Sequence, residues 1–367
     1  MKKSFVPFCS PSVAKQKRLQ MKTENTPDQS CYDVSDLKLI VEELKKKPSL
    51  AGQLADINPG KQGEGGSGNN ELAHYWKQVQ KVFEEACGMN EACWLDQKPL
   101  QDVAYKLTEK FVPKGPVGHE WLSNFDIQEV MDQYEQIYED FLYIGTYPRD
   151  ILSSRFRPLS LFEPFASRRW GGAKTKSLNE KGALPFYYDK GIRKIATVFN
   201  LDCASGGGFH WTSLFIDMSK LKSTGKATVE YFDSVGDHGV VGQRGPRLDP
   251  PVHNNKKFKE HRGGYGSCSR VEIPQFLELL KEELVSMGAK DAQVVRNDYA
   301  HQKGDTECGV YALYFITQRL KGVPFDEFII NEMTDSDMNR LRKFFFRMGG
   351  KKLKKKKGKK RKSKKSK

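Results

Sequence analysis

The sequence lacks the long apolar runs that membrane proteins need. No segment approaches the roughly 18 apolar residues of a membrane-spanning helix, and residues 1–20 are basic without an apolar core, so no secretory signal is expected. Hydrophobic residues make up 38% of the chain and charged residues 29%, which is typical of a soluble protein with some unstructured stretches. These features predict a protein without a membrane span.

Cysteine is scarce and scattered. The chain has seven cysteines, which are Cys9, Cys31, Cys87, Cys93, Cys203, Cys268 and Cys308. An odd and widely spread set is poor material for a disulfide framework and favours a reducing compartment. A zinc site is not expected, because no second close Cys/His pair accompanies Cys87 and Cys93 to complete four ligands. We therefore expect no disulfide framework, no metal and no other cofactor.

Acidic residues are absent from the end of the chain, and this absence locates its charge. The net charge is +15, but residues 351–367 alone contain 13 Lys or Arg and no Asp or Glu, so the other 350 residues carry only +2. Basic blocks of this kind are usually disordered and solvated. Lys351–Lys367 therefore predicts either non-specific nucleic-acid binding or a nuclear targeting signal.

Composition divides the chain into four regions, without an internal repeat. Residues 1–70 are polar and largely flexible, with one helix expected at Ser35–Lys47 and a Gly-rich linker at Pro59–Asn70. The other three are a helical region at residues 71–145, the main folded domain at residues 146–348 and a disordered lysine-rich tail at residues 349–367.

An amphipathic helix is predicted from Ile127 to Phe141, where apolar residues recur at spacings of three and four. Asp126 or Asn124 offers the N-cap. Acidic side chains take the opposite face, so the tyrosines among the apolar residues are expected to lie in the core.

From about residue 190 the pattern changes to short β-branched and aromatic runs, which favour strands. The expected strands are Ile195–Leu201, Phe209–Met218, Ala227–Phe232 and Ala292–Arg296. Helices are expected at Pro274–Met287, Cys308–Leu320 and Ser336–Met348, and a loop or insertion at Gly236–Ser269. Cys308–Leu320 is apolar nearly all round, which predicts a buried helix. This order favours an α+β fold, with a central mixed β-sheet flanked by helices and an N-terminal helical region.

Three segments place chemically useful residues at the edges of these elements. His210 precedes an apolar strand, Asp233 ends another, and Cys308 lies where a polar loop becomes the buried helix. Free thiols have a pKa of about 8.5, so a nucleophilic cysteine needs a partner that favours the thiolate. A helix N-terminus and an adjacent imidazolium supply such partners, and a carboxylate can orient the imidazole.

Gln302 lies six residues before Cys308 and can loop back beside it. Its side-chain amide and the Cys308 N–H would then be the donors that the oxyanion of a tetrahedral intermediate needs. Taken singly, each candidate has a plainer explanation: an inert buried thiol, a packed histidine, a turn-forming aspartate or a solvated glutamine. All four together, each at a segment edge, indicate a cysteine protease with Cys308 as nucleophile.

The order of these blocks resembles that of the SUMO-protease and adenovirus-proteinase class of cysteine proteases. His-Trp comes first, then Asp, then Gln-x5-Cys-Gly at a helix start, whereas papain-type enzymes put the cysteine first. Within that class, FHWTSLFIDM, VEYFDSVG and HQKGDTECGVYALYFITQRL resemble the polyprotein-processing proteases of African swine fever virus and other large DNA viruses. WLSNFDI, at Trp121–Ile127, resembles part of their N-terminal helical region. The resemblance covers roughly residues 120–347 and leaves Gly236–Ser269 and the tail without a counterpart.

The resemblance implies a role for each candidate. His210 would be the general base, Asp233 its orienting acid, Cys308 the nucleophile and Gln302 the oxyanion donor. Trp211 would wall a narrow slot that admits glycine. Asp233 stands where the swine-fever enzyme has asparagine, and both residues can orient an imidazole.

The implied activity is cleavage after Gly-Gly-type sites in viral polyprotein or core-protein precursors during virion maturation. It would take place in the virion and the host-cell cytoplasm, at the virus factory, with the nucleus reachable through the basic tail.

Other functions stay open. A deconjugase or processing protease for SUMO- or ubiquitin-like modifiers would use the same residues and would also prefer Gly-Gly. Some bacterial effectors use this catalytic set to transfer acetyl groups from CoA, although no basic pocket for that donor is evident. A nucleic-acid-binding structural protein with an inactive protease fold would act through the tail, but four filled catalytic positions argue against it.

Overall fold

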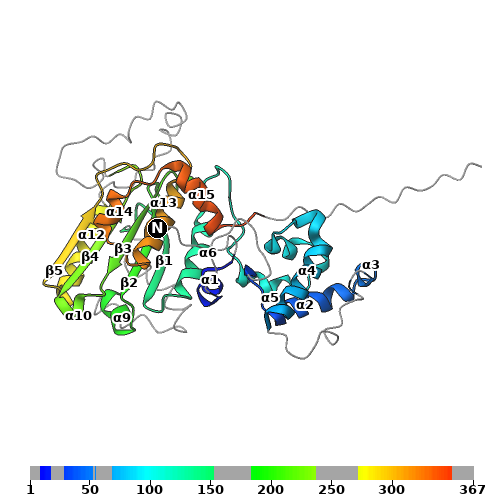
Figure 1. Cartoon of the computed structure of the whole chain (residues 1–367). Coiled ribbons are helices and arrows are strands. Elements are labelled where there is room, and N and C mark those ends of the chain that lie inside the picture. Colours follow the sequence, from blue (N-terminus) through cyan, green and yellow to red (C-terminus); the bar gives the residue numbers. More distant parts are fainter. Residues whose placement is uncertain are drawn as a thin grey trace, which may run out of the picture. The chain divides into compact units, whose positions relative to one another are not determined.

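The computed structural model describes residues 9–17, 29–52, 54, 68–152, 183–236 and 272–348. The chain forms two compact units (Figure 1): unit 1 combines Met1–Lys114 with Arg347–Lys367, and unit 2 is Gly115–Phe346. The division expected at residue 146 differs from this one. Among the described residues, no helix is both long and apolar enough to span a bilayer.

Unit 2 is built on a five-stranded mixed sheet whose strands lie in sequence order. The strands are β1 (Phe141–Pro148), β2 (Lys194–Asn200), β3 (Trp211–Asp217), β4 (Lys226–Phe232) and β5 (Asp291–Arg296). The central pairs β2–β3 and β3–β4 are antiparallel, and the outer pairs β1–β2 and β4–β5 are parallel. The expected α+β fold with a mixed sheet is confirmed, and four of its strands lie where the sequence predicts them.

Helices cover both faces of this sheet (Figure 1). Successive strand residues point to opposite faces, so Leu142 and Ile144 pack in one core and Phe141 and Tyr143 in the other. The first core includes residues of α9 (Ala183–Asp189), α10 (Leu221–Thr224) and α12 (Glu272–Ser286). The second includes residues of α6 (Asn124–Glu135), α13 (Cys308–Leu320), α14 (Phe325–Ile330) and α15 (Asp335–Phe345).

Helix α13 packs on β3 and is buried at 11 of its 13 residues, as predicted. Near its C-terminal end, Arg319 Nη2 donates to Glu230 of β4 at 2.8 Å, which pairs a buried cation with a buried anion. At its start, Gly309 permits a close approach, because a Cβ there would lie 3.0 Å from the Leu122 side chain. The helix that carries the candidate nucleophile is therefore fixed at both ends.

The helix predicted from Ile127 to Phe141 is shorter in the structure. Helix α6 ends at Glu135, and Phe141 opens β1, a strand that the residue pattern does not predict. The N-cap of α6 is Ser123. Its hydroxyl accepts from Asp126 N–H, and the Asp126 carboxylate accepts from Ser123 N–H. Phe141–Ile144 is apolar on both faces, so its spacing fits a helix and a buried strand equally.

Unit 1 is helical around an aromatic core. Trp94 stacks on Tyr32 with centroids 5.7 Å apart, and Trp76 lies 5.6 Å from Trp94. Its helices are α1 (Pro11–Lys17), α2 (Val34–Lys45), α3 (Pro48–Ala51), α4 (Gly68–Cys87) and α5 (Ala104–Leu107), joined by the 3₁₀ turns η3 (Glu91–Asp96), η4 (Lys98–Leu100) and η5 (Thr108–Lys110). Helices α1, α2 and α3 therefore lie within residues 1–70, which were expected to be largely flexible apart from one helix.

Several of the sequence predictions can be compared only in part. Helix α2 matches the helix expected at Ser35–Lys47, and α4 begins inside the expected linker Pro59–Asn70. Residues 59–67 of that linker, nearly all of the Gly236–Ser269 loop and the tail at residues 349–367 lie outside the described residues.

Disulfides are present, so the expectation drawn from the cysteine count was wrong. Cys9 pairs with Cys31 and Cys87 with Cys93, at Cα–Cα distances of 5.4 and 5.5 Å. Cys203 is also disulfide-bonded. An odd count is compatible with disulfides plus one free thiol, and folding brings distant cysteines together. The argument for a reducing compartment therefore loses its basis, while Cys308 is free and buried.

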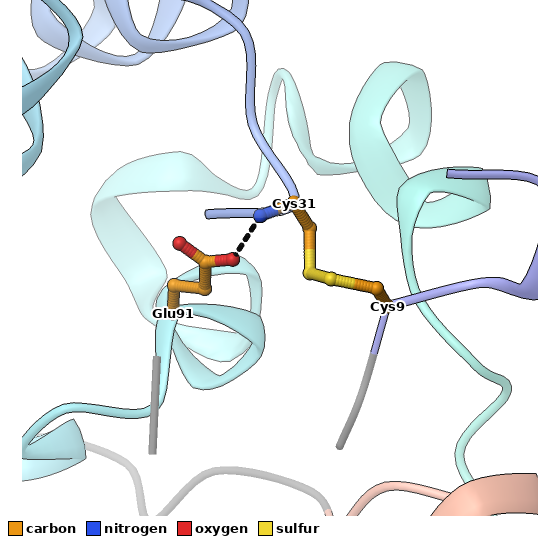
Figure 2. Close-up of side chains that lie close together, drawn as sticks. All are labelled: Cys9, Cys31 and Glu91. Atoms are coloured by element: carbon orange, nitrogen blue, oxygen red, sulfur yellow. Dashed lines mark hydrogen bonds between the residues drawn. A yellow bond between two sulfur atoms is a disulfide. The ribbon is translucent and has the colours of Figure 1, made fainter. Parts of the chain in front are cut away.

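A buried carboxylate lies beside the Cys9–Cys31 disulfide (Figure 2). Glu91 Oε1 accepts from the Cys31 N–H at 2.5 Å, and Oε2 accepts from Ser30 Oγ at 2.8 Å and Trp76 Nε1 at 2.7 Å. The two sulfurs and a carboxylate oxygen lie within 4.8 Å of one another, as metal ligands also do. In the disulfide, however, neither sulfur is the thiolate that zinc binds. Glu91 instead joins three segments of unit 1.

Candidate active site

His210, Asp233 and Cys308 come from three elements that end at the same place in unit 2. His210 directly precedes β3, Asp233 directly follows β4, and Cys308 is the first residue of α13. Because β3 and β4 are antiparallel neighbours, the start of one lies beside the end of the other. Helix α13 packs on β3 and brings its N-terminus to that end.

The three side chains form a connected series. His210 Nε2 lies 2.7 Å from Asp233 Oδ1, and both residues are buried. On the other side, the Cys308 side chain lies near enough to the His210 ring to raise the pKa of that ring. Since Nε2 faces Asp233, Nδ1 is the ring nitrogen left for the sulfur. The structure thus places the predicted thiol, imidazole and carboxylate side by side in the order that activation of a thiol requires.

Asp233 is held in place by Asn297, the residue after β5. The Asp233 N–H donates to Asn297 Oδ1 at 2.9 Å, and Asn297 Nδ2 donates to the Asp233 carbonyl at 2.7 Å. Val235 N–H donates to Asp233 Oδ1 at 3.0 Å. These bonds fix the oxygen that faces the imidazole. The sequence does not point to Asn297, whose signal is only a polar residue at the end of a strand.

The electrostatics of the site favour a charged imidazole. Burial by itself lowers the pKa of His210, but the Asp233 carboxylate and then the Cys308 side chain outweigh it and raise that pKa to about 10. An imidazolium at neutral pH is a suitable counter-ion for a thiolate. The N-terminus of α13 adds a partial positive charge at Cys308. The arrangement can therefore hold a thiolate next to an imidazolium.

Gln302 lies on the loop before α13 and is fixed by Ser234. Ser234 Oγ donates to Gln302 Oε1 at 2.6 Å, and the Ser234 carbonyl accepts from Gln302 N–H at 2.7 Å. Gln302 Nε2 donates one hydrogen to the Gly304 carbonyl at 2.8 Å, which leaves its second hydrogen for another acceptor. Because Ser234 directly follows Asp233, the glutamine is tied to the strand end that carries the imidazole's partner.

A groove of about 480 Å³ leads to Cys308. Trp121 and Trp211 line it, and Trp121 is 44% exposed. Trp211 Nε1 donates to the Leu122 carbonyl at 2.9 Å, which fixes its indole. Trp121 opens the WLSNFDI segment, to which the sequence assigns no catalytic or binding role. The structure adds this residue to the site.

The glycines before His210 form another wall of this groove. Gly208 has a φ of +89°, which favours glycine, and its N–H donates to the Asp202 carboxylate at 3.1 Å. A Cβ on Gly206 would overlap that carboxylate. This wall therefore presents backbone rather than side chains to the groove.

Comparisons with known proteins find similar proteases, although no family model matches the chain. A protein of Acanthamoeba polyphaga mimivirus, described by its name as a thiol protease, is 27% identical over 284 residues, which cover 76% of each chain. The SUMO-1 cysteine protease of an African swine fever virus isolate is 23% identical over 259 residues, covering 70% of this chain and 78% of that one. The crystal structure of the African swine fever virus protease matches with a TM-score of 0.52 and 19% identity, over 95% of this chain and 98% of that chain.

The chain is a cysteine protease. Its relatives are the thiol proteases of mimivirus and African swine fever virus, both large DNA viruses, and it shares the fold of the latter enzyme. The expected enzyme class and the resemblance to viral proteases are thereby confirmed.

Proposed function

We propose that this chain is an endopeptidase that cleaves after Gly-Gly-type sites in viral structural precursor proteins during virion maturation. The observation that carries the proposal is the groove at Cys308, whose lining includes two indoles and a glycine backbone. Side chains on the substrate would collide with the fixed Trp211 and with Trp121. Two successive glycines reach the thiol without that collision.

In this proposal the four site residues act in turn. The Cys308 thiolate attacks the scissile carbonyl, and the His210 imidazolium gives its proton to the leaving amine. Asp233 holds the ring at 2.7 Å so that Nδ1 faces the sulfur. Gln302 and the Cys308 N–H donate to the oxyanion. Water then hydrolyses the thioester, with neutral His210 as general base.

A set of matched peptides tests the specificity. Peptides with Gly-Gly, Ala-Gly, Gly-Ala and Ala-Ala before the scissile bond should be cut in that descending order. Ala-Gly ranks above Gly-Ala because it keeps glycine next to the bond. Trp211→Ala should relax the preference, because it opens the slot. Equal kcat/KM for Gly-Gly and Ala-Ala would refute the steric argument.

A second function has one specific observation in its favour. A relative that is 23% identical is named as a SUMO-1 cysteine protease, so removal of SUMO- or ubiquitin-like modifiers is the alternative. Intact virion precursors should be cut faster than SUMO-type or ubiquitin-type conjugates, with Cys308→Ala protein as the blank. The reverse order would favour the deconjugase.

We further propose that Lys351–Lys367 binds nucleic acid without sequence preference and keeps the protease with its precursors in the virus factory and the virion. The charge supports this proposal, since the tail holds 13 basic residues and no acid. Counterion release from a phosphate backbone favours such contacts.

A further inference from the structure

A buried arginine lies beneath the loop that leads to Cys308. Arg342, on α15, is fully buried, and each of its three nitrogens donates a hydrogen bond. Nη2 donates to the Thr306 carbonyl at 2.7 Å, Nη1 to the Pro116 carbonyl at 3.3 Å and Nε to Asn339 Oδ1 at 3.2 Å. Burying a guanidinium is costly unless such partners compensate. The contacts therefore tie α15 firmly to the loop.

Glu307, the residue before Cys308, completes the network. Its carboxylate is buried and accepts from Thr306 Oγ1 at 2.7 Å, Thr306 N–H at 3.0 Å and Asn339 Nδ2 at 2.9 Å. Burial alone would raise the pKa of Glu307, but these donors and the nearby Arg342 lower it. An ionised Glu307 thus faces Arg342 across the Asn339 amide, which bonds to both.

The two charged side chains hold Thr306 from both sides. Arg342 binds its carbonyl, and Glu307 binds its N–H and hydroxyl. Fixing that carbonyl fixes the peptide plane between Thr306 and Glu307. The next peptide bond carries the Cys308 N–H and is separated from this plane only by the two backbone torsions of Glu307, so the direction of this donor depends on where the plane is held. An oxyanion donor is effective only when it is aimed in advance.

Helix α15 also holds the other end of the loop. Asp335 Oδ2 accepts from Lys303 N–H at 3.0 Å and from Gly304 N–H at 2.7 Å. Gly304 in turn accepts from Gln302 Nε2. One helix therefore supports the surroundings of both proposed oxyanion donors.

We infer that Asn339 and Arg342 are positioning residues that aim the Cys308 N–H at the oxyanion through Glu307 and Thr306. This inference rests on the proposed oxyanion role of that N–H. Neither side chain is required to touch the substrate, so their effect belongs to kcat rather than to KM.

Two variants that keep the charge test the inference. Asn339→Ala removes the link between Glu307 and Arg342, and Arg342→Lys keeps the cation but loses the planar fork. Each is assayed at one fixed pH with a peptide that the wild type cuts. Losing a whole oxyanion donor costs about 10²–10³ in kcat, so a misaimed donor should cost roughly tenfold, with KM nearly unchanged.

Alkylation of Cys308 by iodoacetamide separates aiming from activation. The thiolate displaces iodide at a saturated carbon, so no oxyanion forms and the donors are not used. Both variants should therefore be alkylated at the wild-type rate while their kcat falls. Gln302→Ala gives the reference pattern for a lost donor: a low kcat with normal alkylation.

Arg340→Lys is the matched control. Arg340 lies on the same helix, but its side chain is 70% exposed and pairs with Asp337 within α15. This variant should keep the wild-type kcat. Wild-type kcat in both Asn339→Ala and Arg342→Lys would overturn the inference, and so would alkylation that falls in step with kcat. If Arg342→Lys does not fold, Asn339→Ala decides alone. A wild type that cuts other peptides but not Gly-Gly would refute the proposed specificity and leave this test intact.

Discussion

At the scale of single residues, the three connected side chains contribute unequally. Cys308→Ala removes the nucleophile and should abolish peptide cleavage, and His210→Ala should be nearly as damaging. Asp233→Ala should leave more residual kcat, because Asp233 orients the imidazole without touching the substrate. Asp233→Asn should retain more than Asp233→Ala, since an amide oxygen can still accept from the ring. Steady-state kinetics on one peptide measures all four.

The control for this series is iodoacetamide labelling. Wild-type Cys308 should be the labelled thiol, and labelling should disappear in Cys308→Ala. Full cleavage activity in that variant would remove Cys308 from the mechanism.

Glu91 makes unit 1 sensitive to pH. Burial raises the pKa of Glu91 to about 7, although the Cys31, Trp76 and Ser30 donors work to lower it. Because the folded value lies above the ordinary value near 4.5, the protonated form favours folding. The stabilisation that this protonated form gives to the fold is complete below about pH 4.5 and is lost as the pH rises through about 7. Its upper bound is roughly 3 kcal/mol. Wild-type protein should therefore lose stability relative to Glu91→Gln between pH 5 and pH 8.

Hydrogen exchange can measure this pH-dependent loss of stability in unit 1 alone. Protection of residues 29–36 is compared between wild type and Glu91→Gln at each pH, which cancels the intrinsic pH dependence of exchange. Ser30 can turn its hydroxyl to accept from the glutamine amide, but the amide nitrogen no longer accepts from Trp76 Nε1, so the comparison uses the change of protection with pH rather than its absolute level. Parallel profiles for the two proteins would show that Glu91 does not titrate in this range.

Residues of the site were predictable from the sequence where they occupy element edges. His210, Asp233 and Cys308 flank apolar segments that are easy to recognise. Asn297 and Arg342 act through contacts between distant parts of the chain, which a single sequence does not show. A buried arginine in a polar-looking helix has no local signal at all.

At the scale of elements, the close approach of α13 to the segment before α6 should be the least tolerant contact near the site. Gly309→Ala places a Cβ 3.0 Å from three carbons of Leu122. Leu122 must move, and its carbonyl holds the Trp211 indole. We expect a loss of about 1–3 kcal/mol in unfolding free energy together with a lower kcat/KM.

Gly52→Ala is the control for Gly309→Ala. Gly52 has an ordinary helical φ of −67° and open space around its Cα. Thermal unfolding should leave this control near the wild type. A Gly309→Ala protein that is as stable and active as the wild type would mean that Leu122 relaxes freely.

Element prediction succeeded or failed for physical reasons. Helix α13 was predictable to the residue, because it is apolar all round and Gly322 and Pro324 follow it. The boundary between α6 and β1 was not, because Phe141 continues the helical spacing while it belongs to a strand buried on both faces. The disulfides were missed since their formation depends on folding rather than on spacing.

At the scale of the whole molecule, we expect the basic tail to be separable from the catalytic residues. Deleting Lys351–Lys367 should leave kcat on a short peptide unchanged, because the proposed catalytic residues end at Cys308. It should remove most binding to duplex DNA. In the intact chain that binding should weaken with salt by roughly −0.9 in the log–log slope for each phosphate neutralised.

The tail prediction can fail in two ways. Tight DNA binding by the truncated chain would place the basic surface on the folded units. Loss of peptide cleavage at saturating substrate would make the tail part of the active structure. Titrations at several salt concentrations, with duplexes of different sequence, separate these outcomes.

The composition of unit 1 has a consequence for how the protein is made. Arg347 is buried in that unit, where it donates to the Val112 carbonyl at 3.1 Å and pairs with Asp96. The ribosome supplies it only after all of Gly115–Phe346 has been synthesised. Unit 2 is thus an insertion within unit 1, and unit 1 cannot reach its final packing before Arg347 has been synthesised. A nascent chain would therefore complete its protease fold and its N-terminal unit almost together, once residue 347 has left the ribosome.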